Sequence, residues 1–222
     1  MNASQDVVIL LHGILRTRKS MAGLAKHIEA QGFLTLNFTY ASTKKNLSDL
    51  ADDVQAMMAA EESFHSAKQV HFVTHSMGGL VLRHFLDRHR KNLGGRLGRV
   101  VMLGPPNRGS ELADIFQNIA PYRWIFGPAG QQMTVRENAV QIPQGKVDFE
   151  LGVIAGTVGW PYPDGALLLK GQHDGRVTVE NTKLDGMKDH MTIPVMHGLM
   201  MGHQGVRRNV TQFLKTGRFI PS

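Results

Sequence analysis

The feature that most constrains the fold is an alternation, in the first half of the chain, between short apolar runs and longer stretches with helical spacing. Four runs are rich in aliphatic or β-branched residues and have the length of buried strands: Val7–Leu11, Leu34–Tyr40, Val70–Thr74 and Arg99–Leu103. Three stretches between them repeat apolar residues at every third or fourth position: Met21–Ala30, Leu47–Ser63 and a third from about Gly78 to Lys91. Strands that alternate with helices predict an α/β fold, with a parallel sheet covered by helices on both faces.

The alternation breaks after the fourth run and resumes near the end of the chain. Residues 105–150 hold, among glycines and prolines, the aromatic residues Phe116, Tyr122, Trp124 and Phe126. A segment of this length could hardly fold alone, so we expect a short cap or lid-like excursion within a single domain spanning residues 1–222. Further strands are predicted at Leu151–Ala155, Ala166–Leu169 and Thr192–Met196, and a helix near His203–Lys215. The expected sheet is mainly parallel, with about six strands.

Composition narrows the classes of protein that fit. Hydrophobic residues make up 42% of the 222 residues and charged residues 19%, which is typical of a globular domain. No apolar run approaches the roughly 20 residues that a membrane-spanning helix needs. No secretory signal is visible before the first run, and the lack of cysteine excludes a disulfide framework, a thiolate metal site and a cysteine nucleophile. These features predict a cytoplasmic protein without a transmembrane segment.

The charge balance gives a weaker indication about partners. The net charge of +7, from 25 Lys and Arg against 18 Asp and Glu, allows loose contact with an anionic membrane surface. No long basic run or nucleic-acid-binding signature accompanies this charge, so dedicated nucleic-acid binding is not expected. The histidines lack a metal-ligand spacing such as H-E-x-x-H, and we therefore expect no metal and no organic cofactor.

The strongest chemical signal is the segment Val73–Gly79, which lies between a predicted strand and a predicted helix. In a nucleophile elbow, a serine in this position projects its hydroxyl above the sheet. Ser76 is the candidate nucleophile, and the Met77 amide would face a developing oxyanion at the helix N-terminus. The glycine usually found two residues before the serine is Thr74 here. The alternative is an ordinary strand-to-helix loop in which Ser76 caps the helix.

A second signal lies at the end of the first predicted strand, where His12 and Gly13 follow Leu11. Ligands of open α/β sheets bind beyond the carboxyl ends of the strands. A loop at this place can supply a second oxyanion amide, from Ile14 or from Leu15. We expect His12 to support the loop backbone and not to act as a base, and the alternative is a simple glycine turn with an incidental histidine.

Several separated blocks of the sequence resemble the α/β-hydrolase superfamily, and in particular small bacterial lipase-like serine esterases. Besides the strand–His–Gly start, these blocks are Thr74–Gly79, Leu103–Asp114, Asp174–Glu180 and Gly186–His197. The block from Leu103 is similar to a G-T-P-x-x-G-S motif of that group. The resemblance implies a minimal version of the fold, without the antiparallel strands that larger members have before the first strand seen here. It also implies a catalytic triad in the order serine, acid, histidine.

The acid and the histidine of the implied triad are chosen from the second half of the chain. Asp174 is the candidate acid, because Gly175 allows a sharp turn after it; Asp164 and Asp185, which also lie in glycine turns, remain competitors. His197 is the candidate base, because it follows the predicted strand Thr192–Met196 and precedes the last helix, and His203 is the alternative. His190 is expected before that strand, at the opposite edge of the sheet. The side chain of His75 is expected to point away from that of its neighbour Ser76.

Together these assignments predict a serine hydrolase that cleaves carboxylic esters, with a small-molecule acyl ester as its partner. Leu15, Trp124 and Phe126 are candidate substrate-binding residues. The aromatic residues of residues 105–150 either form a hydrophobic lid or anchor a long connection to the sheet. Two further functions use the same residues: an acyl-thioester hydrolase with the same triad, and a non-catalytic binding module on this scaffold.

Overall fold

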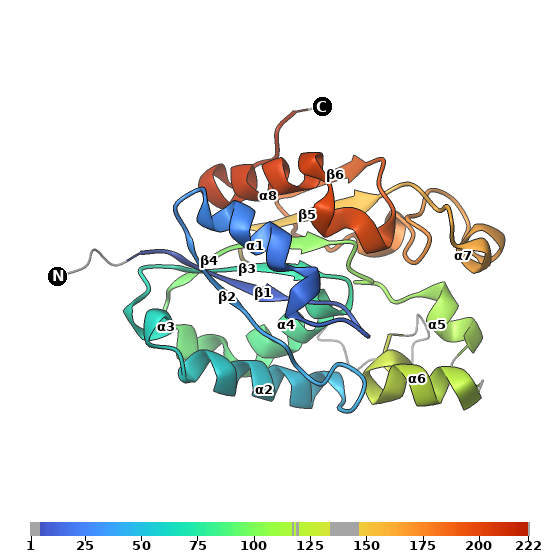
Figure 1. Ribbon diagram of the computed structural model, residues 1–222, viewed down its shortest axis with the longest axis horizontal. Helices are drawn as coiled ribbons and strands as arrows, with labels where there is room; N and C mark the ends of the chain where they lie inside the picture. Colours follow the sequence, from blue (N-terminus) through green and yellow to red (C-terminus); the bar gives the residue numbers. More distant parts are fainter. Residues whose placement is uncertain (1–4, 117, 119, 134–146, 222) are drawn as a thin grey trace.

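A sheet of six parallel strands forms the centre of the computed structural model, which describes residues 5–116, 118, 120–133 and 147–221 (Figure 1). The strands are β1 (Val7–Leu11), β2 (Leu34–Asn37), β3 (Val70–His75), β4 (Leu97–Leu103), β5 (Leu151–Gly156) and β6 (Asp189–Ile193). Their order is β2-β1-β3-β4-β5-β6, and every neighbouring pair runs parallel. The α/β class and the parallel sheet predicted from the sequence are thus confirmed.

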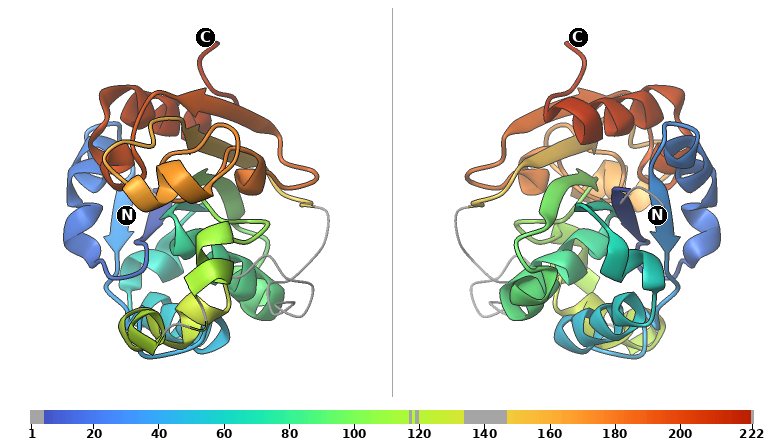
Figure 2. Two further views of the ribbon diagram at one scale, coloured as in Figure 1. Left: turned by 90° about the vertical axis from the view of Figure 1, so that its right-hand side faces the viewer. Right: turned by 90° about the vertical axis from the view of Figure 1, so that its left-hand side faces the viewer.

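Helices cover both faces of the sheet (Figure 2). They are α1 (Ala22–Glu29), α2 (Leu47–Ala59), α3 (Glu62–Ser66), α4 (Met77–His89), α5 (Glu111–Phe116), α6 (Ala120–Gln131), α7 (Pro163–Leu168) and α8 (Gln204–Thr216). Short 3-10 helices lie at Arg18–Ser20 (η1), Arg90–Leu93 (η2), Glu180–Thr182 (η4) and His197–Gly202 (η5). Among the described residues, no helix is both long enough and apolar enough to cross a membrane.

The side chains of β1 explain why both faces need a cover. Val7, Ile9 and Leu11 point to one face and join a buried cluster with α2 and α4, whereas Val8 and Leu10 point to the other and join α1 and α8. All five residues are fully buried, as expected for a central strand of a parallel sheet. Apolar contact on two faces holds this strand, and therefore the loop that follows it, in a defined position.

Several predicted element boundaries were wrong, and the strand predicted at Leu34–Tyr40, for example, ends at Asn37. Most of the predicted strand Ala166–Leu169 belongs instead to helix α7, whose first turn suits Pro163. Four residues are too few to distinguish the two-residue repeat of a strand from the 3.6-residue repeat of a helix. The last strand, predicted at Thr192–Met196, starts and ends earlier, because Pro194 has no N–H for the ladder. His190 consequently lies within β6 and not before it. The helix predicted over Leu47–Ser63 is divided into α2 and α3.

The carboxyl ends of the six strands meet at one edge of the sheet, and the two helices formed by residues 105–150 lie beyond it (Figure 1). Helices α5 and α6 belong to these residues, and α7 follows β5 at the same end of the molecule. The side chains of Phe116 and Tyr122, two members of the expected aromatic cluster, lie outside the described residues. This edge is where the candidate functional residues gather.

Candidate active site

Ser76 occupies a sharp turn between β3 and α4. Its backbone has φ 53° and ψ −126°, and among the described residues Leu15 is the only other non-glycine residue with positive φ. A non-glycine residue in such a conformation costs on the order of 1–3 kcal/mol and persists only where its surroundings enforce it. The Ser76 N–H donates to the Leu103 carbonyl (2.9 Å), and its carbonyl accepts from the Gly79 N–H (2.9 Å). Neighbouring segments therefore hold the serine in the strained geometry that is expected of a nucleophile elbow.

Two glycines after Ser76 let the helix pass close to the sheet. A Cβ on Gly78 would lie 2.5 Å from the Leu11 carbonyl oxygen, so only glycine fits against the end of β1. A Cβ on Gly79 would lie 3.1 Å from the Cβ of Pro105 and 3.3 Å from the sulfur of Met102, so a larger residue would crowd the loop after β4. Thr74, which replaces the usual glycine before the serine, would lie at an ordinary contact distance of 3.4 Å.

Asp174 and His197 form a buried pair. Asp174 Oδ2 lies 2.7 Å from His197 Nδ1, and its other oxygen, Oδ1, accepts hydrogen bonds from the backbone N–H groups of Arg176 (3.0 Å) and Val177 (2.9 Å). The His197 N–H donates to the Asp174 carbonyl (3.0 Å), which joins the two loops a second time. A carboxylate against Nδ1 fixes the imidazole with its proton on that nitrogen and leaves Nε2 as the basic atom.

Gly104, directly after β4, lies against this pair. It has φ +53°, and a Cβ there would lie 3.0 Å from Asp174 Oδ2 and 3.1 Å from His197 Nδ1. Both its conformation and the space around it favour glycine. The sequence contains this residue in one of the family-like blocks, but nothing in the sequence indicates that it faces the acid and the histidine.

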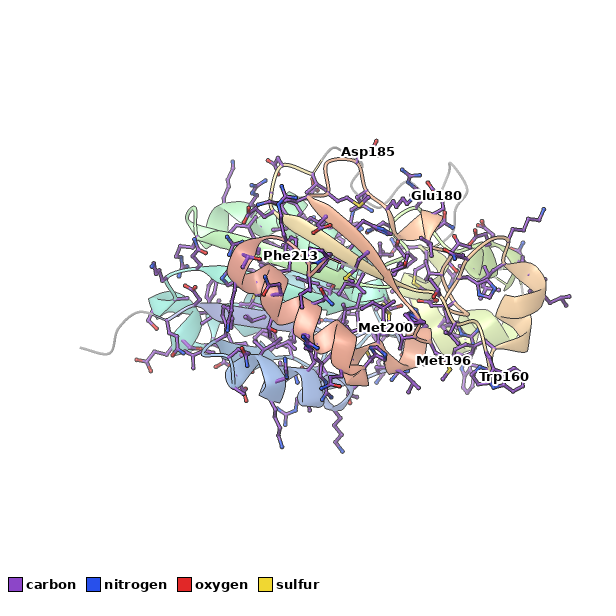
Figure 3. All side chains as sticks on the ribbon, turned by 90° about the horizontal axis from the view of Figure 1, so that it is seen from above. Trp160, Glu180, Asp185, Met196, Met200 and Phe213 are labelled. Carbon is purple, nitrogen blue, oxygen red and sulfur yellow. The ribbon has the colours of Figure 1, made fainter. Side chains whose placement is uncertain are left out.

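The competing residues lie elsewhere. The Asp185 side chain is 87% exposed and pairs with Arg108 (3.4 Å). It lies at the outer edge of the molecule, away from Met196, the residue before His197 (Figure 3). Asp164 belongs to α7, and its side chain lies outside the described residues. His203 precedes α8, and His190 bonds to the hydroxyl of Thr182 (3.1 Å).

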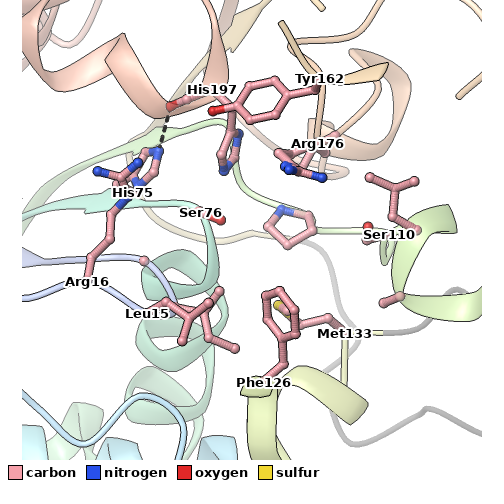
Figure 4. Close-up of a pocket in the computed structure, with 16 residues that line it drawn as sticks. Leu15, Arg16, His75, Ser76, Ser110, Phe126, Met133, Tyr162, Arg176 and His197 are labelled. Atoms are coloured by element: carbon pink, nitrogen blue, oxygen red, sulfur yellow. Dashed lines mark hydrogen bonds between the residues drawn. The ribbon is translucent and has the colours of Figure 1, made fainter. Parts of the chain in front are cut away.

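Ser76 and His197 line the same pocket, which has a volume of about 530 Å³ (Figure 4). Of the expected substrate-binding residues, Leu15 and Phe126 line it too. Trp124 does not line it and is 87% exposed on α6. The structure therefore brings the serine, the histidine and two of the three apolar residues together, with Asp174 behind His197.

Met77 and Ile14 are the residues whose backbone amides are candidates for an oxyanion hole. Met77 is the first residue of α4, where N–H groups have no partner within the helix. Ile14 lines the pocket, and its N–H donates to no group among the described residues. The turn around it is closed by a hydrogen bond from the Arg16 N–H to the Gly13 carbonyl (3.3 Å), with Leu15 at φ 58°.

His12 supports this turn, as the sequence suggested. Its ring stacks on Tyr40 with centroids 4.1 Å apart, and its Nε2 accepts from the Tyr40 N–H (3.3 Å). Nδ1 therefore holds the proton and donates it to the Gly13 carbonyl (2.8 Å). Burial lowers the pKa of His12, so the ring is neutral at pH 7.

His75 contacts the candidate base directly, a role that the sequence analysis missed. Its Nε2 donates to the His197 carbonyl (3.0 Å), and the two ring centroids are 4.7 Å apart. Burial, and then the charge of His197, hold the pKa of His75 well below its usual value. His75 is therefore a neutral positioning residue for His197, and its place next to Ser76 in the sequence gave no sign of this contact.

Known structures with the same architecture support the assignment of the fold. The mature lipase BlEst2 of Bacillus licheniformis has a TM-score of 0.76 and 19% identity, over 99% of this chain and 94% of that one. A metagenomic carboxyl esterase, MGS0156, has a TM-score of 0.66 and 17% identity, over 89% and 66%. The phospholipase PlaB of Legionella pneumophila has a TM-score of 0.65 and 19% identity, over 82% of this chain and 45% of PlaB.

These similarities and the parallel sheet define the class: the protein has an α/β-hydrolase fold. Residues 2–122 match the model of a family described as a domain of unknown function, DUF7379, and the chain belongs to that family. No curated protein matches the sequence.

Proposed function

We propose that this protein is a serine hydrolase that cleaves carboxylic esters. The observation that carries the proposal is that Ser76, on a turn with positive φ, opens into the same pocket as His197, whose Nδ1 lies 2.7 Å from the buried Asp174 carboxylate. The similarity of the fold to a lipase and to a carboxyl esterase supports it. The expected cap formed by residues 105–150 and a small-molecule acyl ester as substrate belong to the same proposal.

In this mechanism His197 Nε2 takes the proton from Ser76 Oγ as the oxygen attacks the ester carbonyl carbon. The imidazolium that forms is stabilised by Asp174. It then gives the proton to the leaving alcohol oxygen as the C–O bond breaks, which leaves an acyl-enzyme on Ser76. A water molecule, activated by the same imidazole, attacks the acyl carbon, and Ser76 Oγ recovers a proton as the acid leaves.

The N–H groups of Met77 and Ile14 are assigned to the oxyanion hole. Each would donate to the negative oxygen of the tetrahedral intermediate, and the loss of one such donor typically costs about 3 kcal/mol in the activation free energy. Leu15 and Phe126 provide apolar surface for the acyl chain.

The test is reaction with a fluorophosphonate probe, combined with hydrolysis of p-nitrophenyl esters and of acyl-CoA thioesters. We expect labelling and ester hydrolysis in the wild type, loss of both in Ser76→Ala, and retention of both in Ser48→Ala, whose serine lies on α2 away from the pocket. Labelling that persists in Ser76→Ala would contradict the proposal. Absence of labelling in the folded wild type would favour a binding module, and faster cleavage of thioesters would change the substrate class.

A further inference from the structure

The charged side chains that line the pocket are both positive. Arg16 follows the turn at Ile14 and Leu15, and Arg176 lies two residues after the candidate acid. Among the described residues, no carboxylate lines the pocket. The carboxylate of Asp174 is fully buried behind His197, and both of its oxygens already accept hydrogen bonds. A substrate that enters the pocket therefore meets positive charge.

Arg16 has no counter-ion in the part of the chain that the structure describes: its guanidinium makes no ion pair and no hydrogen bond there. The guanidinium lies beside His75 (Figure 4) and contributes, after burial and His197, to lowering the pKa of His75. The two histidines near it, His12 and His75, both have lowered pKa values and do not offset its charge. A half-buried guanidinium that lines a pocket and has no partner among the described residues is a ready donor for an anion.

Arg16 and Tyr162 both lie against Gly198, the residue after His197. A Cβ on Gly198 would lie 3.0 Å from an Nη atom of Arg16 and 2.8 Å from the Tyr162 hydroxyl oxygen. The guanidinium carbon of Arg176 lies 4.3 Å from the centroid of the Tyr162 ring. We call Arg16, Tyr162 and Arg176 the basic wall. Figure 4 shows it around His197, opposite Leu15, Phe126 and Met133.

The two sides of the pocket thus differ in chemistry. The apolar side chains can pack against an acyl chain, whereas the basic wall surrounds the imidazole that would protonate the leaving alcohol. The leaving group must lie within hydrogen-bond reach of His197 at that step. The alcohol part of the ester would consequently lie next to the basic wall.

We propose that the basic wall binds an anionic group, a carboxylate or a phosphate, on the alcohol part of the substrate. The preferred substrate class is then a carboxylic ester with an apolar acyl chain and a negatively charged alcohol. This inference rests on the proposed function. Guanidinium groups bind both kinds of anion through paired N–H donors, and the Tyr162 hydroxyl adds a further donor.

The experiment compares kcat/KM for matched esters at low ionic strength. The alcohol pair is 4-(butyryloxy)benzoate against its neutral methyl ester, with 4-(butyryloxy)phenyl phosphate as the phosphate member. The acyl pair is 4-nitrophenyl hemiglutarate against 4-nitrophenyl valerate. The variants are Arg16→Gln, Arg176→Gln and, as a matched control, Arg18→Gln, which removes a charge from an exposed arginine outside the pocket.

We expect the wild type and Arg18→Gln to prefer the charged alcohol by about tenfold or more, and this preference to weaken with salt. Arg16→Gln should reduce it by about tenfold and Arg176→Gln by less, because kcat/KM for the charged esters should fall more than kcat/KM for the neutral esters. The ranking of benzoate against phosphate tells which anion fits. Three results would overturn the inference while the esterase proposal stands. The wild type could lack the preference, it could prefer the charged acyl chain, or the preference could be unchanged in Arg16→Gln.

If no ester is cleaved, the proposed function fails and binding alone decides the inference. Isothermal titration with benzoate and with phenyl phosphate should then give salt-dependent binding that Arg16→Gln abolishes and Arg18→Gln retains. Absence of binding to the wild type would overturn it.

Discussion

The two sides of the pocket are held by different means. One side, which we call the catalytic side, holds the candidate triad Ser76, Asp174 and His197, which follow strands or lie in loops at the sheet edge. The other side comes from residues 105–150, which we call the excursion, and contributes Phe126 and Met133. On the catalytic side, glycines pack against backbone or against the triad pair, and N–H groups fix the carboxylate. The excursion, by contrast, exposes large apolar side chains on its helices: Ile115, Trp124 and Ile125.

The contacts of α6 with the body of the protein explain the difference. Among the described residues, Gln132 accepts a hydrogen bond from the Leu47 N–H (2.7 Å), and Gly127 packs so closely on the Thr43 carbonyl that a Cβ would lie 1.8 Å from its oxygen. Under the proposed function, chemistry that requires fixed distances would lie on the sheet, and the excursion would share in selecting the substrate.

The largest expected effect breaks the catalytic side at its nucleophile. Ser76→Ala should reduce kcat for p-nitrophenyl butyrate by about 10⁴-fold or more, because attack on the carbonyl carbon then has no hydroxyl. The melting temperature should not fall, since the change removes only an oxygen. A residual activity within tenfold of the wild type would mean that another group is the nucleophile.

A second change tests how rigidly the sheet holds the acid and the base. Gly104→Ala should lower kcat by about 100-fold, because the new methyl group meets Asp174 Oδ2 and His197 Nδ1 at about 3 Å. Gly94→Ala is the matched control: Gly94 has a similar φ of +58° but no atom within 4 Å of its Cβ position. Both variants should lose stability by about 1 kcal/mol, and only Gly104→Ala should lose activity. Equal activity of the two variants would argue against close contact at the triad.

Acid should destabilise the body of the protein outside the excursion. Burial lowers the pKa of five histidines: His12, His71, His75, His84 and His190. The pKa of His84 falls to about 4. Each titrates near 6.5 in the unfolded chain. Below that pH the unfolded chain binds protons that the folded protein does not, so the free energy of unfolding falls as pH decreases. The excursion contains no histidine.

Urea denaturation between pH 7 and pH 5 measures this dependence. We expect a slope of up to about 1.4 kcal/mol per pH unit, a tenfold change in the folding equilibrium, for each such histidine. His84→Gln should reduce the slope between pH 6 and pH 5. A free energy of unfolding that stays level or rises on acidification would contradict the burial of these rings in the neutral form.

The smallest effect separates two aromatic residues of the excursion. Phe126→Ala should raise KM for p-nitrophenyl octanoate by about fivefold, because it removes apolar surface from the pocket, and should change the acetate ester little. Trp124→Ala, on the same helix but pointing to solvent, should leave both values within twofold. If Trp124→Ala has the larger effect, the excursion must adopt another arrangement when substrate binds.

The sequence alone was sufficient for the architecture. The spacing of apolar residues, as in the strands Val7–Leu11 and Val70–Thr74, is a local property, because it depends on which side chains of one segment must be buried. The errors fell where this signal is short or interrupted, as at Ala166–Leu169, or where Pro194 ends a strand before its apolar run ends. The triad candidates followed from the order of blocks in the chain, which the resemblance made interpretable.

Only the tertiary structure decided which loops face one another at the sheet edge. The Asp174–His197 pair, Gly104 against it, the hydrogen bond from His75 and the basic wall all join residues that are distant in sequence. Trp124 and Phe126 are two positions apart and equally aromatic, yet only Phe126 lines the pocket. Such contacts depend on strand order, register and the path of each loop, and the spacing of apolar residues within a segment carries no information about them.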